Sequence, residues 1–325
     1  MLIDMLSASL AKSGALDDAW AKLDSGQDAT VGVASSARPF LVAARFAADP
    51  RATLVVTAGE EAADTFARTV GAFVGEERVL RLPDYEGNPF SLDAPPQPRL
   101  HGRRLEALWS LQQGKPAVVV ASARALLRRI APAKEEVARP LALVAGSDLS
   151  EEPQRGIACF EDLEHCLVSM GYENSGKLDG PGTFSVQGGA IDVYPGNLAY
   201  PVRLDFFGDE LDEIRRFLPS TGQTISSLEQ VDIFPVREFA QTDAALLRAK
   251  RAISKSAETN AAQRELLERL EDDSRELPDL MAAYLLEKTA AVGDYLPADA
   301  LTVLIEPRSL VDDALQIFAA DLVHG

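Results

Sequence analysis

Short apolar segments alternate with helical patterns through the first 150 residues of this chain. Strands are expected at residues 30–34, 52–58, 78–83 and 117–122. Helices are expected after each of them, at residues 39–48, 60–74, 99–114 and 123–132. Strands that are apolar along their whole length and are connected by helices are typical of a parallel sheet covered on both faces. The pattern therefore predicts a doubly wound α/β domain.

The pattern changes after residue 150. Residues 183–237 form several short apolar segments, and Gly208 and Asp209 predict a tight turn between two strands. From residue 242 the chain is helical and acidic, and a last apolar segment at residues 299–307 could rejoin the first sheet. We therefore expect an α/β domain at 1–150, an inserted α+β domain at 151–238, and a helical segment with a final strand at 239–325.

Composition narrows the classes of function. The 325 residues carry a formal net charge of −18, which disfavours general binding of nucleic acid and suits contact with a basic protein surface. The two cysteines, Cys159 and Cys166, have neither disulfide-framework nor zinc-site spacing, so we expect no metal and a reducing cytoplasm. No run of about 18 apolar residues and no signal peptide is present, so no membrane partner is expected.

The segment "VGVASSARPF" at residues 31–40 has the strand–turn–helix pattern of a phosphate-binding loop. Counting the loop motif from Gly32 places Ala37, Arg38 and Pro39 where glycine, lysine and a hydroxyl residue would lie. Proline has neither an N–H nor a hydroxyl, although it is well suited to the first turn of a helix. A plain strand–turn–helix connection is favoured over a working ATP site. The binding of an anion at the helix N-terminus is an alternative that stays open.

The second half of an ATPase site would be an Asp-Glu pair at the end of a later strand. The matching segment "LTVLIEPRS" offers Glu306 followed by Pro307. Proline cannot polarise a water molecule. Changes in both segments predict an ATPase architecture without hydrolysis, and hence no catalytic residues.

One predicted strand has an unusual outer face. In "PVRLDFFGDELDEI", the side chains of Arg203, Asp205 and Phe207 alternate with apolar ones and should share one face. Arginine and aromatic residues are enriched at interface hot spots. The alternative is ordinary packing, with Phe207 in the core and Arg203 paired with Asp205 or Glu210.

Four segments together resemble the N-terminal part of the transcription-repair coupling factors of the Mfd family, a region similar to the excision-repair protein UvrB. They are "LPDYEGNPF", "VVVASARALLRRIAP", "GTFSVQGGAIDVYP" and "PVRLDFFGDELDEIRRF", in this order. The resemblance implies a degenerate helicase-like, UvrB-like parallel-sheet domain with a small α+β insertion. It also implies that the insertion binds UvrA and that the C-terminal domain of the full-length protein masks it.

The resemblance also implies what this chain leaves to other parts of the parent protein. RNA polymerase and DNA would be contacted by those parts, and ATP and magnesium would serve their motor, so no cofactor is expected here. Only "SLDAPPQP" lies between Phe90 and Arg99, which leaves no room for the DNA-clamping hairpin of UvrB.

The candidate UvrA contacts are Arg203, Phe207, Gln187 and Asp205. Arg203 and Phe207 match family contacts, whereas Gln187 stands where the family has a second arginine. Two alternatives stay open: a nucleotide-using enzyme with a divergent loop, and a DNA-binding module.

Overall fold

The computed structural model describes residues 2–85, 96–151, 155–240, 242–255, 261–271, 277, 281–312 and 314. Contacts divide the chain into two units, each described here by itself. The first takes its described residues from Met1–Leu82, Ser110–Ala125 and Leu296–Asp321, and the second from Pro83–Trp109 and Leu126–Tyr295. The domain boundaries expected from the sequence stay a prediction.

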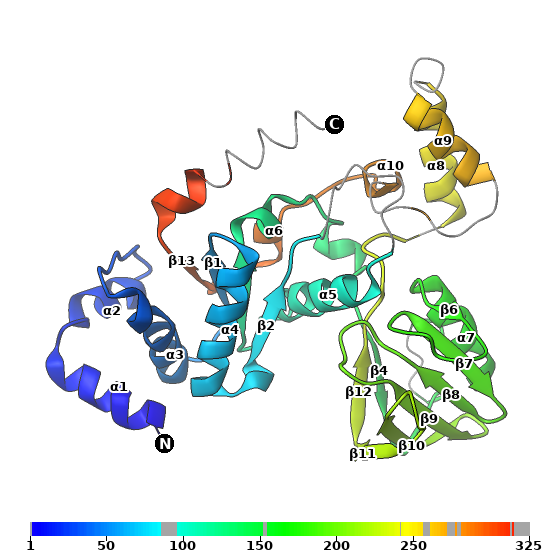
Figure 1. Ribbon diagram of the computed structural model, residues 1–325, viewed down its shortest axis with the longest axis horizontal. Coiled ribbons are helices and arrows are strands. Elements are labelled where there is room, and N and C mark those ends of the chain that lie inside the picture. Colours follow the sequence, from blue (N-terminus) through cyan, green and yellow to red (C-terminus); the bar gives the residue numbers. More distant parts are fainter. Residues whose placement is uncertain are drawn as a thin grey trace. The chain divides into compact units, whose positions relative to one another are not determined.

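A parallel sheet forms the centre of the first unit (Figure 1). Its strands, in spatial order, are β13 (Leu301–Leu304), β1 (Thr53–Thr57), β3 (Val118–Ser122) and β2 (Val79–Leu82). All three pairings are parallel, and every residue of β1 and β3 is buried. The α/β class is therefore confirmed, as is the return of the last strand to the first sheet.

Helices of the first unit cover this sheet through an apolar core. Its helices are α1 (Leu2–Ser13), α2 (Asp17–Asp24), α3 (Arg38–Ala48) and α4 (Glu60–Val74), with the 3-10 turns η1 (Ser35–Ala37) and η2 (Glu76–Arg78). The helices α3 and α4 pack on each other, and α4 packs on β1, β2 and β3. Their buried side chains include Phe46, Phe66 and Val70, which meet Val55 and Val120 of the sheet. The three- and four-residue spacing of apolar residues in the sequence explains this burial.

Two local expectations for the first unit are wrong. Residues 31–34 form no strand, and the Val31 side chain is 37% exposed. The edge of β1 is taken by β13 instead. The segment at residues 31–34 is also short and contains Gly32, so it offers little apolar surface to bury. The helix expected at 123–132 is the shorter α6 (Ala123–Leu127).

An antiparallel sheet dominates the second unit, as the sequence predicted for residues 183–237 (Figure 1). The strands are β11 (Thr224–Leu228), β10 (Glu210–Phe217), β9 (Val202–Phe207), β8 (Ala190–Val193), β7 (Thr183–Gln187) and β6 (Glu173–Asn174), in spatial order. The short β5 (Ser147–Asp148) pairs with the start of β10, and β6 pairs with β7 in parallel. The predicted turn is present, since Gly208 adopts a φ of 64° between β9 and β10.

One face of this sheet is buried under α7 (Phe160–Ser169). The shared core includes Leu163 and Leu167 of the helix, and Phe184, Ile191 and Leu204 of the strands, all at most 1% exposed. A separate pair of strands, β4 (Leu141–Val144) and β12 (Gln230–Ile233), packs on the same core. The insertion is therefore a sheet with one face buried under α7 and a second face that is exposed at Gln187 and Phe207 and only in part elsewhere on β7 and β9. We call this second face the free face.

Further helices complete the second unit. They are α8 (Asp243–Ser254), α9 (Ala261–Glu271) and α10 (Ala282–Leu285), with the 3-10 turns η3 (Ala133–Glu135) and η5 (Val292–Tyr295). The helices α8 and α9 lie side by side (Figure 1) and share an apolar cluster with α10. No helix among the described residues is long and apolar enough to cross a membrane.

The helix α5 (Pro98–Gln112) is held in the second unit by a buried ion pair. The Arg104 side chain is fully buried, and its Nε donates to Glu238 Oε1 at 2.5 Å. Gly102 lets the helix approach another segment closely, because a Cβ there would meet Asn197 N at 2.5 Å. Most of the "LPDYEGNPF" segment, and residues 91–95 after it, lie outside the described residues.

Candidate functional site

The free face of β9 presents the side chains that the alternation predicts. Arg203 and Asp205 are partly exposed and Phe207 is 84% exposed, whereas Leu204 is fully buried. Phe206 points to the other face and packs edge-on against Phe160 of α7, with ring centroids 5.2 Å apart. The expectation of one shared face is confirmed, and the alternative that Phe207 lies in the core is wrong.

Arg203 is held by the neighbouring strand rather than by its own. Its Nε and Nη2 donate to the two carboxylate oxygens of Asp192 on β8, each at 2.6 Å. Its guanidinium also lies over the Phe217 ring at 5.6 Å. The hydrogen bond to Asp192 is the main cause of a raised pKa of Arg203. The alternative pairing with Asp205 or Glu210 is therefore wrong, because the counter-ion is Asp192.

A second ion pair continues across the same face. Asp205 Oδ2 accepts from Arg215 Nη2 of β10 at 2.6 Å, and Arg215 Nε lies 3.3 Å from Glu213 Oε2. The exposed Gln187 on β7 pairs in register with Ala190, which pairs with Asp205. Residues paired in register project from the same face. The four candidates therefore share one face on β7 and β9.

Three contributors to this face were not singled out from the sequence: Asp192, Arg215 and Phe217. The signal for Asp192 was present, because its neighbours Ile191 and Val193 alternate with it in "AIDV". Its partner could not be predicted from the sequence, because the pairing of Asp192 with Arg203 follows only when the register of β8 on β9 is known.

The hairpin that carries Phe207 is fixed to the rest of the second unit. The Phe160 N–H at the start of α7 donates to Asp209 Oδ1 at 2.8 Å, and the Leu149 N–H donates to the Asp209 carbonyl at 3.1 Å. These contacts and the Phe206–Phe160 pair hold the tip on a rigid support. The backbone that carries Phe207 is therefore held in place, which lowers the entropy lost on binding a partner.

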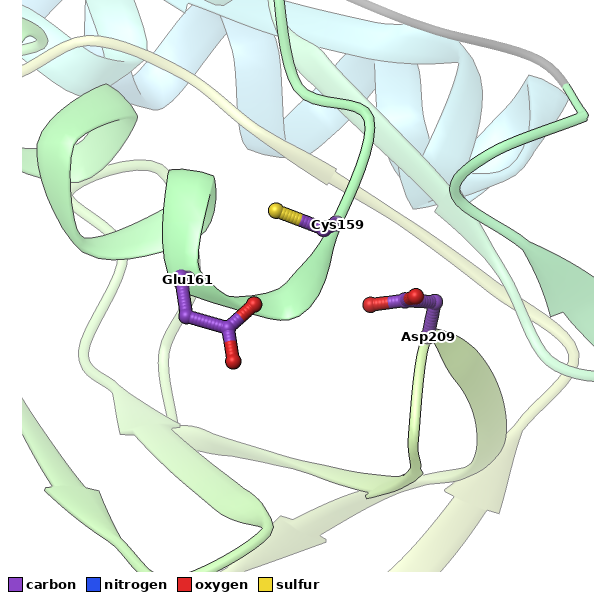
Figure 2. A group of neighbouring side chains, drawn as sticks. All are labelled: Cys159, Glu161 and Asp209. Carbon is purple, nitrogen blue, oxygen red and sulfur yellow. The ribbon is translucent and has the colours of Figure 1, made fainter.

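Asp209 also belongs to a group whose ligand atoms lie within 4.8 Å of one another, with Cys159 and Glu161 (Figure 2). The group surrounds the start of α7, where Cys159 is the N-cap residue. A helix N-terminus carries partial positive charge and disfavours a cation. The Asp162 N–H lowers the pKa of Cys159, but the Asp162 side chain, desolvation and Glu161 raise it more, so the thiol is a poor metal ligand. Within this group Asp209 caps the helix, because its Oδ1 accepts from the Phe160 N–H.

The structure brings two residues of the degenerate nucleotide loop together. Arg38 begins α3, and its Nη1 lies 2.7 Å from Glu306 Oε1, just after β13. The side chains are 26% and 55% exposed. Glu306 has a φ of 55°, an uncommon conformation for a residue other than glycine. The Glu306 carboxylate therefore already neutralises Arg38, the cation at the position of the motif lysine.

The other candidate residues of this site lack the groups that the phosphate-binding motif requires. Ala37 ends η1, Pro39 is buried in the first turn of α3, and a Cβ on Gly32 would meet no atom within 4 Å. Pro307 begins a helical segment at residues 307–312. Stacked glycine N–H groups, which cradle phosphate in such loops, have no counterpart in residues 32–39.

Comparisons with known proteins identify relatives of this chain. Residues 157–239, which include the whole candidate face, match the family described as the UvrB interaction domain. The transcription-repair-coupling factor of Myxococcus xanthus is 38% identical over 232 residues, which are 69% of this chain and 18% of that protein. The same factor of Bacillus subtilis is 29% identical over 244 residues, 70% of this chain and 20% of that protein.

A third relative extends the match. The transcription-repair-coupling factor of Staphylococcus aureus is 23% identical over 291 residues, 85% of this chain and 24% of that protein. The chain thus spans about a fifth to a quarter of the length of these curated relatives.

Proposed function

We propose that this chain, which is an N-terminal region of the transcription-repair-coupling factors with a UvrB interaction domain, is a non-catalytic docking module that recruits UvrA. Its role would be to bring UvrA to a stalled RNA polymerase in transcription-coupled nucleotide excision repair. Other parts of the parent protein would contact polymerase and DNA and would use ATP and magnesium. The C-terminal domain of that protein would mask the docking face at rest.

One observation carries the proposal: Phe207 is 84% exposed on the free face of β9, inside the matched interaction domain. A large exposed aromatic side chain on a rigid support is the kind of anchor that dominates protein interfaces. Full burial of such a side chain contributes about 1.5–3 kcal/mol. Arg203 lies two residues away on the same face and keeps one guanidinium nitrogen outside its pair with Asp192.

The absence of catalysis is proposed from the loop. Arg38 is paired with Glu306, and the loop and later strand both carry proline where an ATPase needs functional groups. A nucleotide titration of the chain tests this part. We expect no heat and no thermal shift with Mg-ATP, and a saturable signal would favour the nucleotide-using alternative.

The docking role is tested by calorimetric titration with UvrA from the same organism. Phe207→Ala should weaken binding by about 2 kcal/mol, or about 30-fold. Arg203→Ala should weaken binding by a similar amount. Arg203→Lys keeps the charge but loses the planar guanidinium, so its affinity should lie between those of the wild type and Arg203→Ala. Leu247→Ala is the matched control, because Leu247 is 50% exposed but lies on α8.

Arg203→Ala leaves the nearly buried Asp192 without its counter-ion, so thermal unfolding of each variant must accompany the titration. The double variant Asp192→Asn with Arg203→Ala removes both charges and separates folding from binding. Equal affinity of UvrA for the wild type, Phe207→Ala and Arg203→Ala would refute the proposed face.

A further inference from the structure

Three neighbouring strands place an aromatic ring and two carboxylates in one row. Phe207 of β9 pairs in register with Glu210 of β10, and Glu210 pairs with Asp148 of β5. Side chains paired in register project from the same face, about 5 Å apart. We call Phe207, Glu210 and Asp148 the hairpin row.

The two carboxylates of the hairpin row oppose each other. Like charges directly opposite in a sheet destabilise it. Ser150 donates from its hydroxyl at 2.6 Å and from its N–H at 2.8 Å to Asp148 Oδ1, and these bonds, the hydroxyl first, lower the pKa of Asp148. Neither Asp148 nor Glu210 has a salt bridge to a described lysine or arginine. The described residues therefore supply no cation to either carboxylate.

A hollow of about 510 Å³ lies at this end of the row. Residues 141–144 and 146–149 line it, together with Glu151, Ile157 and Glu210. Asp148, Glu151 and Glu210 supply three carboxylates, and its described lining contains no lysine or arginine. The hollow is wide enough for a long side chain and negative around its rim.

The cations of the face cannot balance these acids, because they are already engaged. Arg203 is held by Asp192, and Arg215 lies between Asp205 and Glu213. Between Gln187 and Arg216 the sequence has six acidic and three basic residues, a net charge of −3. An acidic partner would be repelled here, whereas a basic one would be complementary.

We propose that the partner surface which docks on this face is a basic protein surface: an apolar socket receives Phe207, and a lysine or arginine beside the socket enters the hollow between Glu210 and Asp148. This inference rests on the proposed function, and it defines the chemistry of the UvrA surface that this chain selects. The cation would pair with both carboxylates, to which the described residues offer no lysine or arginine.

The test uses charge-neutral variants of the two acids and UvrA from the same organism. Glu210→Gln and Asp148→Asn should each weaken binding about three- to fivefold, as expected for a partly exposed ion pair. Wild-type affinity should fall as salt rises, and the double variant should show a weaker dependence. Glu268→Gln is the matched control, since Glu268 is exposed on α9 in the same unit and lies off the sheet.

Thermal unfolding of these variants gives a second readout. Glu210→Gln should leave the melting temperature unchanged while binding becomes weaker. Asp148→Asn should lower the melting temperature slightly, because the two Ser150 hydrogen bonds then reach a neutral amide. Glu210→Gln that binds UvrA as tightly as, or more tightly than, the wild type would overturn the inference and leave the proposed function standing. Failure of the wild type to bind UvrA at all would overturn both.

Discussion

The buried ion pair of Arg104 and Glu238 gives the sharpest test of what holds the second unit together. The Arg104 side chain is 0% exposed and that of Glu238 is 6% exposed. Desolvation alone would lower the pKa of Arg104, but the charge of Glu238 raises it well above its ordinary value. Arg104 also donates to the Pro83 carbonyl at 2.5 Å and lies over the Tyr85 ring at 5.0 Å. One side chain therefore joins α5 to three other positions in this unit.

Arg104→Met should lower the free energy of unfolding by about 3–5 kcal/mol, because it leaves the Glu238 carboxylate buried without its counter-ion. At about 2–4 °C per kcal/mol this corresponds to a fall in melting temperature of about 6–20 °C. Urea denaturation followed by circular dichroism measures the difference directly. Arg104→Met combined with Glu238→Leu removes both charges and should recover much of the loss.

The same pair predicts an acid dependence of stability. Desolvation raises the pKa of Glu238, but the charge of Arg104 and then His101 lower it more, to about 2 from an ordinary 4.5. A depressed carboxyl pKa contributes stability that is complete above about pH 4.5 and is lost as the pH falls toward 2. The wild type should therefore lose more stability than the double variant in this window. A loss below about 1 kcal/mol in Arg104→Met, or identical acid profiles, would refute the argument.

Three further changes have expected outcomes. Gly102→Ala should lower the free energy of unfolding by about 1–3 kcal/mol, because the new Cβ would meet the Gly196 backbone at 2.6 Å; thermal unfolding measures it. Glu306→Gln should change stability by less than about 1 kcal/mol, since its pair with Arg38 is partly exposed, and a phosphate titration by calorimetry reports whether the freed guanidinium gains an anion. Gln187→Arg should not tighten UvrA binding if the partner surface is basic, and a clear gain in affinity would show an acidic group opposite this position.

The sequence predicted the sheet of the first unit well, with one instructive error. Apolar segments with regular spacing identified β1, β2, β3 and the return of β13. They also predicted a strand at residues 30–34 that does not form. The local pattern of apolar residues indicates whether a segment could form a strand. Whether that segment joins the sheet depends on which other segments compete for the same edge. The pairing of β13 with β1 joins residues almost 250 positions apart, which no local pattern contains.

The candidate face was predictable in its orientation but not in its partners. A period of two placed Arg203, Asp205 and Phe207 on one side of β9, and the structure agrees. The counter-ion of Arg203 lies on β8, so its identity depends on the cross-strand register. For the same reason the hairpin row, which spans three strands, was invisible in the sequence.

Buried charge was the least predictable feature. Arg104 lies in "RLHGRRLEAL", where several basic residues suggest an exposed helix face. It is fully buried, and it forms an ion pair with Glu238, which lies 134 positions later in the sequence. The spacing of residues in the sequence cannot distinguish a solvated arginine from a buried one whose counter-ion belongs to a distant segment.

The two candidate sites differ in how well the chain satisfies its own groups, and this difference supports the proposed docking role. In the nucleotide loop, the cation Arg38 is met by Glu306 within the same unit. On the free face of β9, Arg203 and Arg215 are likewise paired, but Phe207 remains 84% exposed and Glu210 faces Asp148 without a cation. Folding gains nothing from an exposed ring beside opposed carboxylates. A partner surface would gain from both, which favours the free face of β9 over the loop as the proposed docking site.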